Sequence, residues 1–251
     1  MKFIRPLFLG LILPLAVAAA DADLLVKDAL AAEARLDSHG ALQLFLAADK
    51  VRPNDAFILQ KIAHQYSDMV VDLPTEEEKL KSIENALAYA QRSVDLDPKS
   101  AVNALSLAVC HGKLAEISGT RYKVRYSRLV KEEADRALAL DPDYAWAHHL
   151  VGRWNYEVAS LGAGARFFVK LFYGGLPAAT VEQGIEHLQR AVALEPGQLE
   201  HQLELGLAYL AAGQKEQARK NIEKGLAMPS REKHDEAAKT RARDALARLN
   251  G

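Results

Sequence analysis

One stretch of the sequence, residues 199–229, constrains the fold more than any other. It reads LEHQLELGLAYLAAGQKEQARKNIEKGLAMP. Apolar residues recur at helical spacing on both sides of Gly213, which predicts two helices joined by a turn. Small residues at Gly206 and Ala218 would let the two helices approach closely. Larger residues would fill the space around them: Leu205, Tyr209 and Ile222. The stretch therefore predicts an antiparallel helix pair that ends at Pro229.

This pair resembles a tetratricopeptide repeat, whose pattern is L-G-x-x-Y, then A-x-x-x-F, then P. Four earlier prolines end helices in similar settings, because proline cannot continue a helix. They are Pro53, Pro98, Pro142 and Pro196. These prolines lie 45, 44 and 54 residues apart, whereas a plain repeat is about 34 residues long. The excess predicts insertions between the two helices of a repeat, near residues 70–79, 118–128 and 160–179.

The predicted fold class is all-α. We expect a tetratricopeptide-like α-solenoid of about five helix-pair repeats with three intra-repeat insertions. A charged, alanine-rich segment over residues 231–249 is typical of a C-terminal helix that caps such an array.

The N-terminus predicts a secretory signal. Two basic residues precede an apolar run, and alanines ending at Ala20 provide the small residues of a cleavage site. The run is too short to span a membrane comfortably. We expect residues 1–20 to be the signal peptide and residues 21–251 to be the repeat domain, located in the periplasm or secreted. An uncleaved anchor is the alternative.

Composition and motifs argue against several kinds of site. The formal net charge is −1, which gives no reason to expect a nucleic-acid partner. The single cysteine, Cys110, rules out an internal disulfide, and its apolar surroundings predict a buried thiol. His148 and His149 are adjacent on a helix and point about 100° apart, so they are not expected to share a metal. No catalytic motif is present, and we expect neither an enzyme nor a cofactor.

A more specific resemblance lies in the fourth repeat. Gly152-Arg153-Trp154, the long insertion after it and Pro177-Ala178-Ala179-Thr180 resemble the regulator of microtubule dynamics family of tetratricopeptide proteins. The resemblance covers roughly residues 55–249 and implies an all-helical domain without catalytic residues. Eukaryotic members are associated with microtubules, and one is a membrane-contact-site tether whose repeat domain binds phospholipid. A microtubule partner is not expected for an exported relative.

The concave face provides the candidate binding site. In a tetratricopeptide array the first helix of each pair lines this face, and the motif register places mostly apolar and aromatic residues there. The candidate groove residues are Val102, Leu105, Val109, Trp146, His149, Arg153, Tyr156, Leu203, Leu207 and Leu210. The same register places Phe57 and His64 on this face in an earlier repeat. An apolar stripe of this size is expected to be covered. The cover would be a lipid, a segment of a partner protein, or the insertions and C-terminal helix of the chain itself.

Two insertions combine aromatic and basic residues. The third holds a candidate membrane or lid segment, comprising Phe167, Phe168, Leu171, Phe172 and Tyr173. Cations interleave with these residues, which suits a membrane interface or a lid over a lipid, while packing on a neighbouring helix is the alternative. The second holds a basic patch comprising Arg121, Lys123, Arg125 and Arg128. This patch would meet a lipid phosphate or remain solvated and paired with nearby glutamates.

The sequence therefore predicts a non-enzymatic, exported helical repeat protein. Its expected ligand is an apolar molecule, with phospholipid as the first choice, bound in the concave groove. The alternative is a protein–protein interaction scaffold in a cell-envelope assembly. Contact with a membrane surface is a further expectation.

Overall fold

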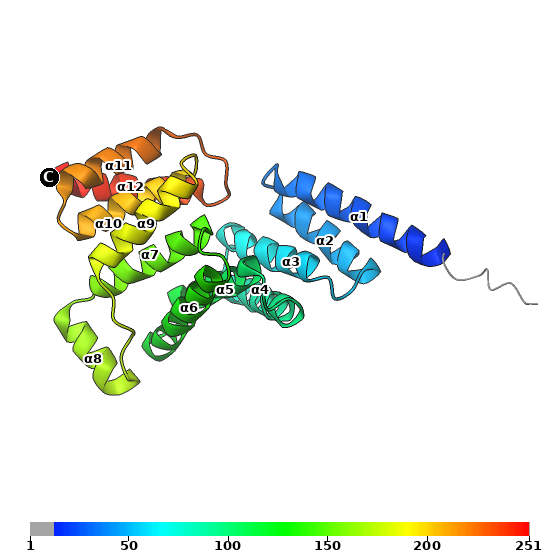
Figure 1. The fold of residues 1–251 in the computed structure, drawn as a ribbon, viewed down its shortest axis with the longest axis horizontal. Coiled ribbons are helices and arrows are strands. Elements are labelled where there is room, and N and C mark those ends of the chain that lie inside the picture. Colours follow the sequence, from blue (N-terminus) through cyan, green and yellow to red (C-terminus); the bar gives the residue numbers. More distant parts are fainter. Residues whose placement is uncertain (1–12, 251) are drawn as a thin grey trace, which may run out of the picture.

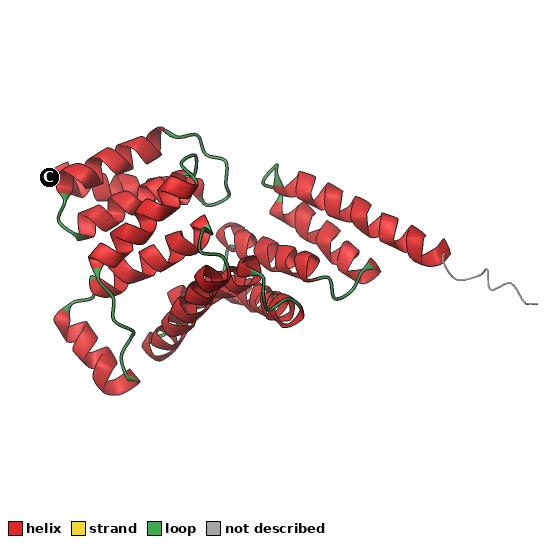
Figure 2. Cartoon of the chain, viewed as in Figure 1, coloured by secondary structure: helices red, strands yellow, loops and turns green. Residues whose placement is uncertain are grey.

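The computed structural model describes the backbone of residues 13–250 and the side chains of residues 21–249. Within this range every regular element is a helix, as Figures 1 and 2 show. In chain order the α-helices are α1 (Leu13–Glu33), α2 (Ser38–Val51), α3 (Ala56–Met69), α4 (Glu76–Leu96), α5 (Ala101–Ile117), α6 (Thr120–Leu140), α7 (Ala145–Ala159), α8 (Ala163–Tyr173), α9 (Val181–Leu194), α10 (Leu199–Ala211), α11 (Lys215–Ala227) and α12 (Asp235–Asn250).

The helices are arranged as successive antiparallel pairs (Figure 1). The closest packing joins α1 to α2, α3 to α4, α5 to α6, α7 to α9 and α10 to α11. Each pair also packs on the next, and α12 lies against both α10 and α11. Such an array buries its core between neighbouring repeats. The predicted all-α solenoid of five helix pairs with a C-terminal cap is confirmed, although the cap begins at Asp235 rather than at residue 231.

Residues 199–229 form the predicted antiparallel helix pair, which consists of α10 and α11. A Cβ atom added to Gly206 of α10 would lie 2.6 Å from Ile222 Cγ1 and 3.2 Å from the Ala218 carbonyl oxygen of α11. The two helix backbones can approach this closely because Gly206 has no side chain. Gly213, at the turn between the helices, has a φ of 72°, which is the left-handed conformation that glycine adopts without strain.

The three insertions lie where the proline spacing places them, and each has a different form. The first is the short 3-10 helix η1 (Val70–Asp72) followed by an α4 of 21 residues. The second lengthens α5 and α6 to 17 and 21 residues. The third forms the separate helix α8 and an extended segment over residues 175–180. Additional residues are tolerated here because they extend helices or run over the surface.

The core between repeats consists of small and branched side chains. Ala63, Ala86 and Ala90 pack with Leu107 of the next pair, and all four are almost wholly buried. Cys110 lies in the same cluster with 1% of its surface exposed. Burial raises the pKa of its thiol to about 12. The predicted buried thiol is therefore confirmed.

The predicted signal peptide lies largely outside the described residues. Its residues 1–12 are not described, and residues 13–20 belong to α1, which continues to Glu33 without a break. Among the described residues, every helix is too short or too polar to cross a membrane.

Candidate functional site

The predicted groove residues lie on the first helices of the pairs, which are α3, α5, α7 and α10. The loop before α12 reaches α3 across this face, through contacts described below, so the face is the inner, concave side of the solenoid. The face divides into an open half in the second and third repeats and a filled half in the fourth and fifth repeats.

The open half lies on α3 and α5, which contact each other. Phe57 and Val102 occupy the same register position on the two helices and are 48% and 44% exposed. Val109, two turns further along α5, is 36% exposed. Leu105 differs from these three residues, because it is buried against Ala104 and against Ala147 of α7. Three apolar side chains of this half therefore remain available to a ligand.

The filled half is covered by the chain itself. His149, Tyr156 and Leu203 are all at least nine-tenths buried. Leu207 and Leu210 pack with apolar side chains of the capping helix, together with Leu203. The residues of α12 in this cluster are Ala238, Ala242, Ala245 and Leu246. The capping helix thus provides the cover that the apolar stripe of α10 requires.

A buried carboxylate joins three helices in the filled half. Glu204 of α10 is 1% exposed, and its two oxygens accept hydrogen bonds from the Tyr156 hydroxyl of α7 and the Arg241 guanidinium of α12. Burial alone would raise the pKa of Glu204, but the positive charges of Arg153 and Arg241 outweigh burial and lower it. Arg153 also donates to Glu157 at 2.8 Å on the more exposed side of α7. The ionised carboxylate therefore ties the cap to the array.

Two buried histidines lie next to this carboxylate. His149 Nδ1 and His201 Nδ1 are 3.0 Å apart. Trp146 packs against both rings, with centroid distances of 5.2 Å to His149 and 4.6 Å to His201. Burial lowers the pKa of His149 to about 4 and that of His201 to about 3, so both rings are neutral near pH 7. The cluster closes the inner face between α7 and α10.

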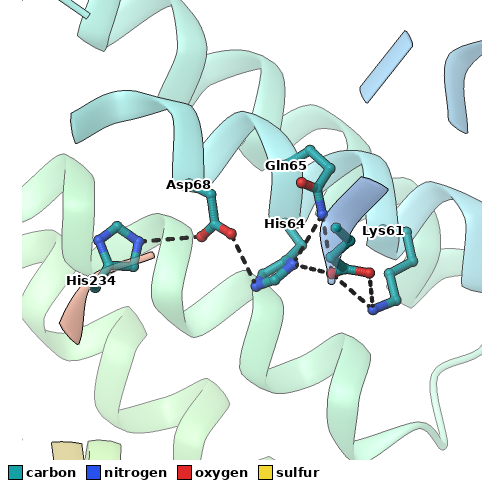
Figure 3. Close-up of polar contacts among 6 residues, drawn as sticks. Lys61, His64, Gln65, Asp68 and His234 are labelled. Carbon is teal, nitrogen blue, oxygen red and sulfur yellow. Dashed lines mark hydrogen bonds and ion pairs between the residues drawn. The ribbon is translucent and has the colours of Figure 1, made fainter. Parts of the chain in front are cut away.

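A chain of polar side chains crosses the open half (Figure 3). Lys61 Nζ donates to Glu33 Oε2 at 2.9 Å, and His64 Nδ1 donates to Glu33 Oε1 at 2.9 Å. The other ring nitrogen of His64 lies 3.6 Å from Asp68 Oδ2. His234 Nε2 lies 3.2 Å from Asp68 Oδ1. This chain, which we call the inner-face relay, connects α1, α3 and the loop before α12.

The charges within the inner-face relay stabilise one another. Burial would lower the pKa of His64, but its hydrogen bond to Glu33 and the charges of Asp68 and Glu33 raise it. Burial would raise the pKa values of Asp68 and Glu33. The Asp68 pKa is lowered by His234 and His64, and the Glu33 pKa is lowered by His64 and Lys61. Such an arrangement favours the ion-paired state, although the His64 side chain keeps 42% of its surface exposed.

Glu200 of α10 lies near the end of this relay. Burial raises its pKa to about 7, and the negative charges of Asp235 and Glu204 act in the same direction. A carboxyl group that titrates near neutral pH is a common feature of functional sites, but it is also found in structural charge networks.

Sequence reasoning missed most members of these two networks. Asp68 had a local signal, because it lies four residues after His64 on the same face of α3. Glu33, Glu204 and Arg241 had none, since each meets its partners across at least 28 residues of sequence. His148 and His149 are separated as expected, since His148 Nδ1 faces His187 of α9 at 2.9 Å and His149 faces His201 of α10.

The aromatic insertion and the basic patch come together outside the inner face. Both line a cavity of about 480 Å³ between α6 and the C-terminal end of α8. Its walls are Arg121, Tyr122, Val124, Arg125, Arg128, Phe172 and Tyr173. In Figure 1, α8 lies at the edge of the molecule rather than over the inner face. The main helix contact of α8 is with α6.

No group of three or more His, Cys, Asp or Glu side chains within the described residues is placed to hold a metal ion. Glu33, Asp68, Glu204 and the histidines described above are instead paired with each other or with Lys, Arg and Tyr side chains.

Comparison with known proteins identifies relatives. A family model described as "Regulator of microtubule dynamics protein 1-3" matches residues 20–250. The chain is 28% identical over 194 residues to Regulator of microtubule dynamics protein 1 of Bos taurus, covering 76% of this chain and 61% of that protein. It is 30% identical over 139 residues to Regulator of microtubule dynamics protein 3 of Xenopus laevis, covering 55% of this chain and 30% of that protein. The matches thus span less than two thirds of these relatives.

A solved structure supports the fold. A tetratricopeptide protein of Thermus thermophilus, TTC0263, is similar with a TM-score of 0.63 at 20% identity, covering 90% of this chain and 99% of that chain. At this identity the likeness concerns the fold alone. The family model covers nearly the whole chain and agrees with the motif of the fourth repeat, so this protein belongs to the family of regulator of microtubule dynamics proteins 1-3.

Proposed function

We propose that this protein is a non-enzymatic interaction scaffold that holds a segment of a partner protein on the open half of its inner face. The observation that carries the proposal is the exposure of Phe57, Val102 and Val109 at inner-face positions of two adjacent repeats. Helical repeat proteins use such concave surfaces to bind partners. Removing an apolar side chain of this size from water lowers the free energy, which favours binding of a partner.

The polar neighbours of these residues suggest the character of the segment. Lys61, His64 and Asp68 lie on α3 beside Phe57, and the charge of Lys113 on α5 acts on Asp68. A partner helix with apolar anchors and charged flanks would match this combination. The filled half would position the open half rather than bind the segment itself.

The proposal is tested by site-specific photo-crosslinking in the native host. A photoreactive phenylalanine at Val102 or Val109 should crosslink to one protein, and crosslinking at Val102 should be lost when Val109 is changed to Glu. Val71, which is 50% exposed in η1, provides the control position. Crosslinks no stronger than those at Val71 would refute the proposal.

A phospholipid in the groove is the other occupant expected from the sequence, and we place it second. Leu105, Tyr156 and Leu203 would have to line the site for its acyl chains, and all three are buried against neighbouring helices. Solvent extraction of the purified protein followed by mass spectrometry separates the two proposals. Stoichiometric lipid that is absent from a Val102→Glu, Val109→Glu variant would favour lipid over a protein segment.

The proposal of export rests on residues 1–20 alone. Intact-mass analysis of the protein from its host should give a chain beginning at Asp21, and a retained Met1 would contradict cleavage. The names of the relatives refer to microtubule dynamics, but an exported protein would not meet microtubules, so we do not propose that role.

A further inference from the structure

Helix α8 presents an apolar face to solvent. No residue of α8 is buried. Phe167, Phe168, Leu171 and Phe172 are 67%, 45%, 61% and 62% exposed. Their spacing places them on one side of the helix, over roughly 140° of its circumference. Four large apolar side chains in one exposed patch usually mark a surface that another component covers.

The remaining residues of α8 make it amphipathic. Val169 and Tyr173 are the partly buried residues of its other side. Arg166 and Lys170 are exposed and lie outside the apolar arc. Cationic side chains beside an aromatic face can extend their charged ends toward lipid headgroups while the rings enter the acyl boundary. This distribution is typical of helices that lie in a membrane interface.

The orientation of α8 is fixed by an arginine of the basic patch. Arg128 of α6 donates through Nε to the Gly175 carbonyl at 2.9 Å, and its Nη2 also donates to the Tyr173 carbonyl. The chain turns sharply there, because Gly174 has a φ of 77°. These contacts hold the C-terminal end of α8 beside the first half of α6. The apolar face and the basic patch therefore form a single surface.

Charge on this surface is of one sign. Residues 118–131 and 160–180 together contain seven Lys and Arg and no Asp or Glu, in a chain whose formal net charge is −1. Arg121, Lys123 and Arg125 are exposed, and none of them forms an ion pair with a carboxylate of the described residues. The cavity of about 480 Å³ lies where these cations meet Phe172 and Tyr173. It is open to solvent and combines cationic and aromatic walls.

We propose that α8 and the first half of α6 form a docking surface for a lipid bilayer that contains anionic lipid. The exposed rings would enter the membrane interface, and the cations beside them would attract negatively charged headgroups. A bilayer satisfies both features over one continuous surface. The proposal is independent of what occupies the inner face, because the two surfaces lie on different parts of the molecule.

Vesicle flotation of the full chain tests the proposal. Vesicles of phosphatidylcholine alone are compared with vesicles in which about one third of the lipid is phosphatidylglycerol. We expect binding to the anionic vesicles that weakens as salt is added. The triple variant Arg121→Gln, Lys123→Gln, Arg125→Gln should lower the partition coefficient on the order of 100-fold. The double variant Phe167→Ser, Phe172→Ser should abolish flotation.

Matched controls remove the same number of charges or of exposed apolar side chains elsewhere. The charge control is Lys81→Gln, Lys99→Gln, Lys215→Gln, and the apolar control is Val71→Ser, Leu96→Ser, all at exposed positions. All variants share one N-terminus, so any contribution from residues 1–20 is constant. Circular dichroism confirms that each variant is folded.

A local reporter distinguishes docking by α8 from adsorption elsewhere. In a Phe172→Trp variant with Trp146→Phe and Trp154→Phe, the fluorescence should shift to the blue on anionic vesicles. The proposal is overturned if there is no shift, if the two substituted sets bind as strongly as their controls, or if the aromatic face instead mediates self-association that Phe167→Ser, Phe172→Ser abolishes. Binding of the apolar face of α8 to a protein segment instead of to vesicles would also overturn the proposal.

Discussion

His234 Nε2 lies 3.2 Å from Asp68 Oδ1, although 166 residues separate them in the sequence. His234 belongs to the loop before α12, and Asp68 belongs to α3 near the other end of the array. A second contact, between Lys233 Nζ and Asp72 Oδ2 at 2.6 Å, joins the same loop to η1. The capping end of the solenoid therefore touches its second repeat and bounds the open half of the inner face.

Breaking this contact should release the loop without unfolding the array. In an Asp68→Asn, Asp72→Asn variant, amide hydrogen exchange over residues 229–234 should accelerate at least several-fold. The free energy of unfolding should fall by only about 1 kcal/mol, because exposed and partly exposed ion pairs contribute little. Asp28→Asn, at an exposed position on α1, is the control. Unchanged exchange in the double variant would show that the contact does not hold the loop.

The inner-face relay should be strongest at mildly acidic pH. The raised pKa of His64 gives stabilisation that is complete below its ordinary value of 6.5 and is lost as pH rises through the folded-state value. The lowered pKa values of Glu33 and Asp68 give stabilisation that is complete above their ordinary values of 4.5 and 3.8 and is lost as pH falls through the folded-state values. All contributions therefore coincide between about pH 4.5 and 6.5.

The measurement is the difference in unfolding free energy between the unaltered protein and a His64→Gln variant. This difference should be largest within that window and should decrease above it. A difference that is constant from pH 5 to pH 9 would contradict an ion-paired His64.

Glu204 should be essential to the attachment of the capping helix. Glu204→Ala would leave Arg241 and the Tyr156 hydroxyl without their carboxylate partner in a buried site, which should cost about 3–5 kcal/mol. Urea unfolding measures the loss. Glu157→Ala removes a carboxylate whose side chain is 49% exposed and should cost no more than about 1 kcal/mol. Equal losses in the two variants would contradict this assignment.

The buried histidine pair should make the protein sensitive to acid. Because the pKa values of His149 and His201 are lowered, the unfolded chain binds protons first, and stability present above pH 6.5 is lost as pH falls toward about 4 and about 3. Each histidine should contribute a slope of about 1.4 kcal/mol per pH unit below its ordinary pKa. A His39→Gln control, at an exposed position, should keep the full slope. A free energy of unfolding that stays constant between pH 6 and pH 4.5 would contradict the lowered pKa values of this pair.

The close approach of α10 and α11 should not tolerate a methyl group. Gly206→Ala would place a Cβ atom 2.6 Å from Ile222 Cγ1 and 3.0 Å from its backbone nitrogen, so the helices must separate. The expected loss is about 1–3 kcal/mol in chemical unfolding. Gly197→Ala is the control, because a Cβ atom there has no neighbour within 4 Å. A neutral Gly206→Ala variant would show that the pair can separate without cost.

Much of the architecture could be predicted because it depends on local patterns. The stop at each proline, the Gly206–Ala218 packing and the constant offset from proline to the next helix are properties of short segments, and they located the repeats and insertions. The form of each insertion could not be predicted, since one became longer helices and another became the separate helix α8. The form of an insertion depends on whether its residues can pack against another part of the fold.

The sequence by itself determined the helical repeats, the buried thiol of Cys110 and the helices that carry the inner face. Only the tertiary structure decided which parts of that face are open. Leu207 and Val109 are both apolar and occupy the same position of the repeat pattern, yet α12 covers the first and nothing within the described residues covers the second, which is 36% exposed. Glu204 also depends on distant partners, which are Tyr156 and Arg241, and Asp68 depends on His234 as well as on its near neighbour His64. Local patterns specify which face a side chain occupies, but burial and charge pairing depend on which distant segment packs against that face.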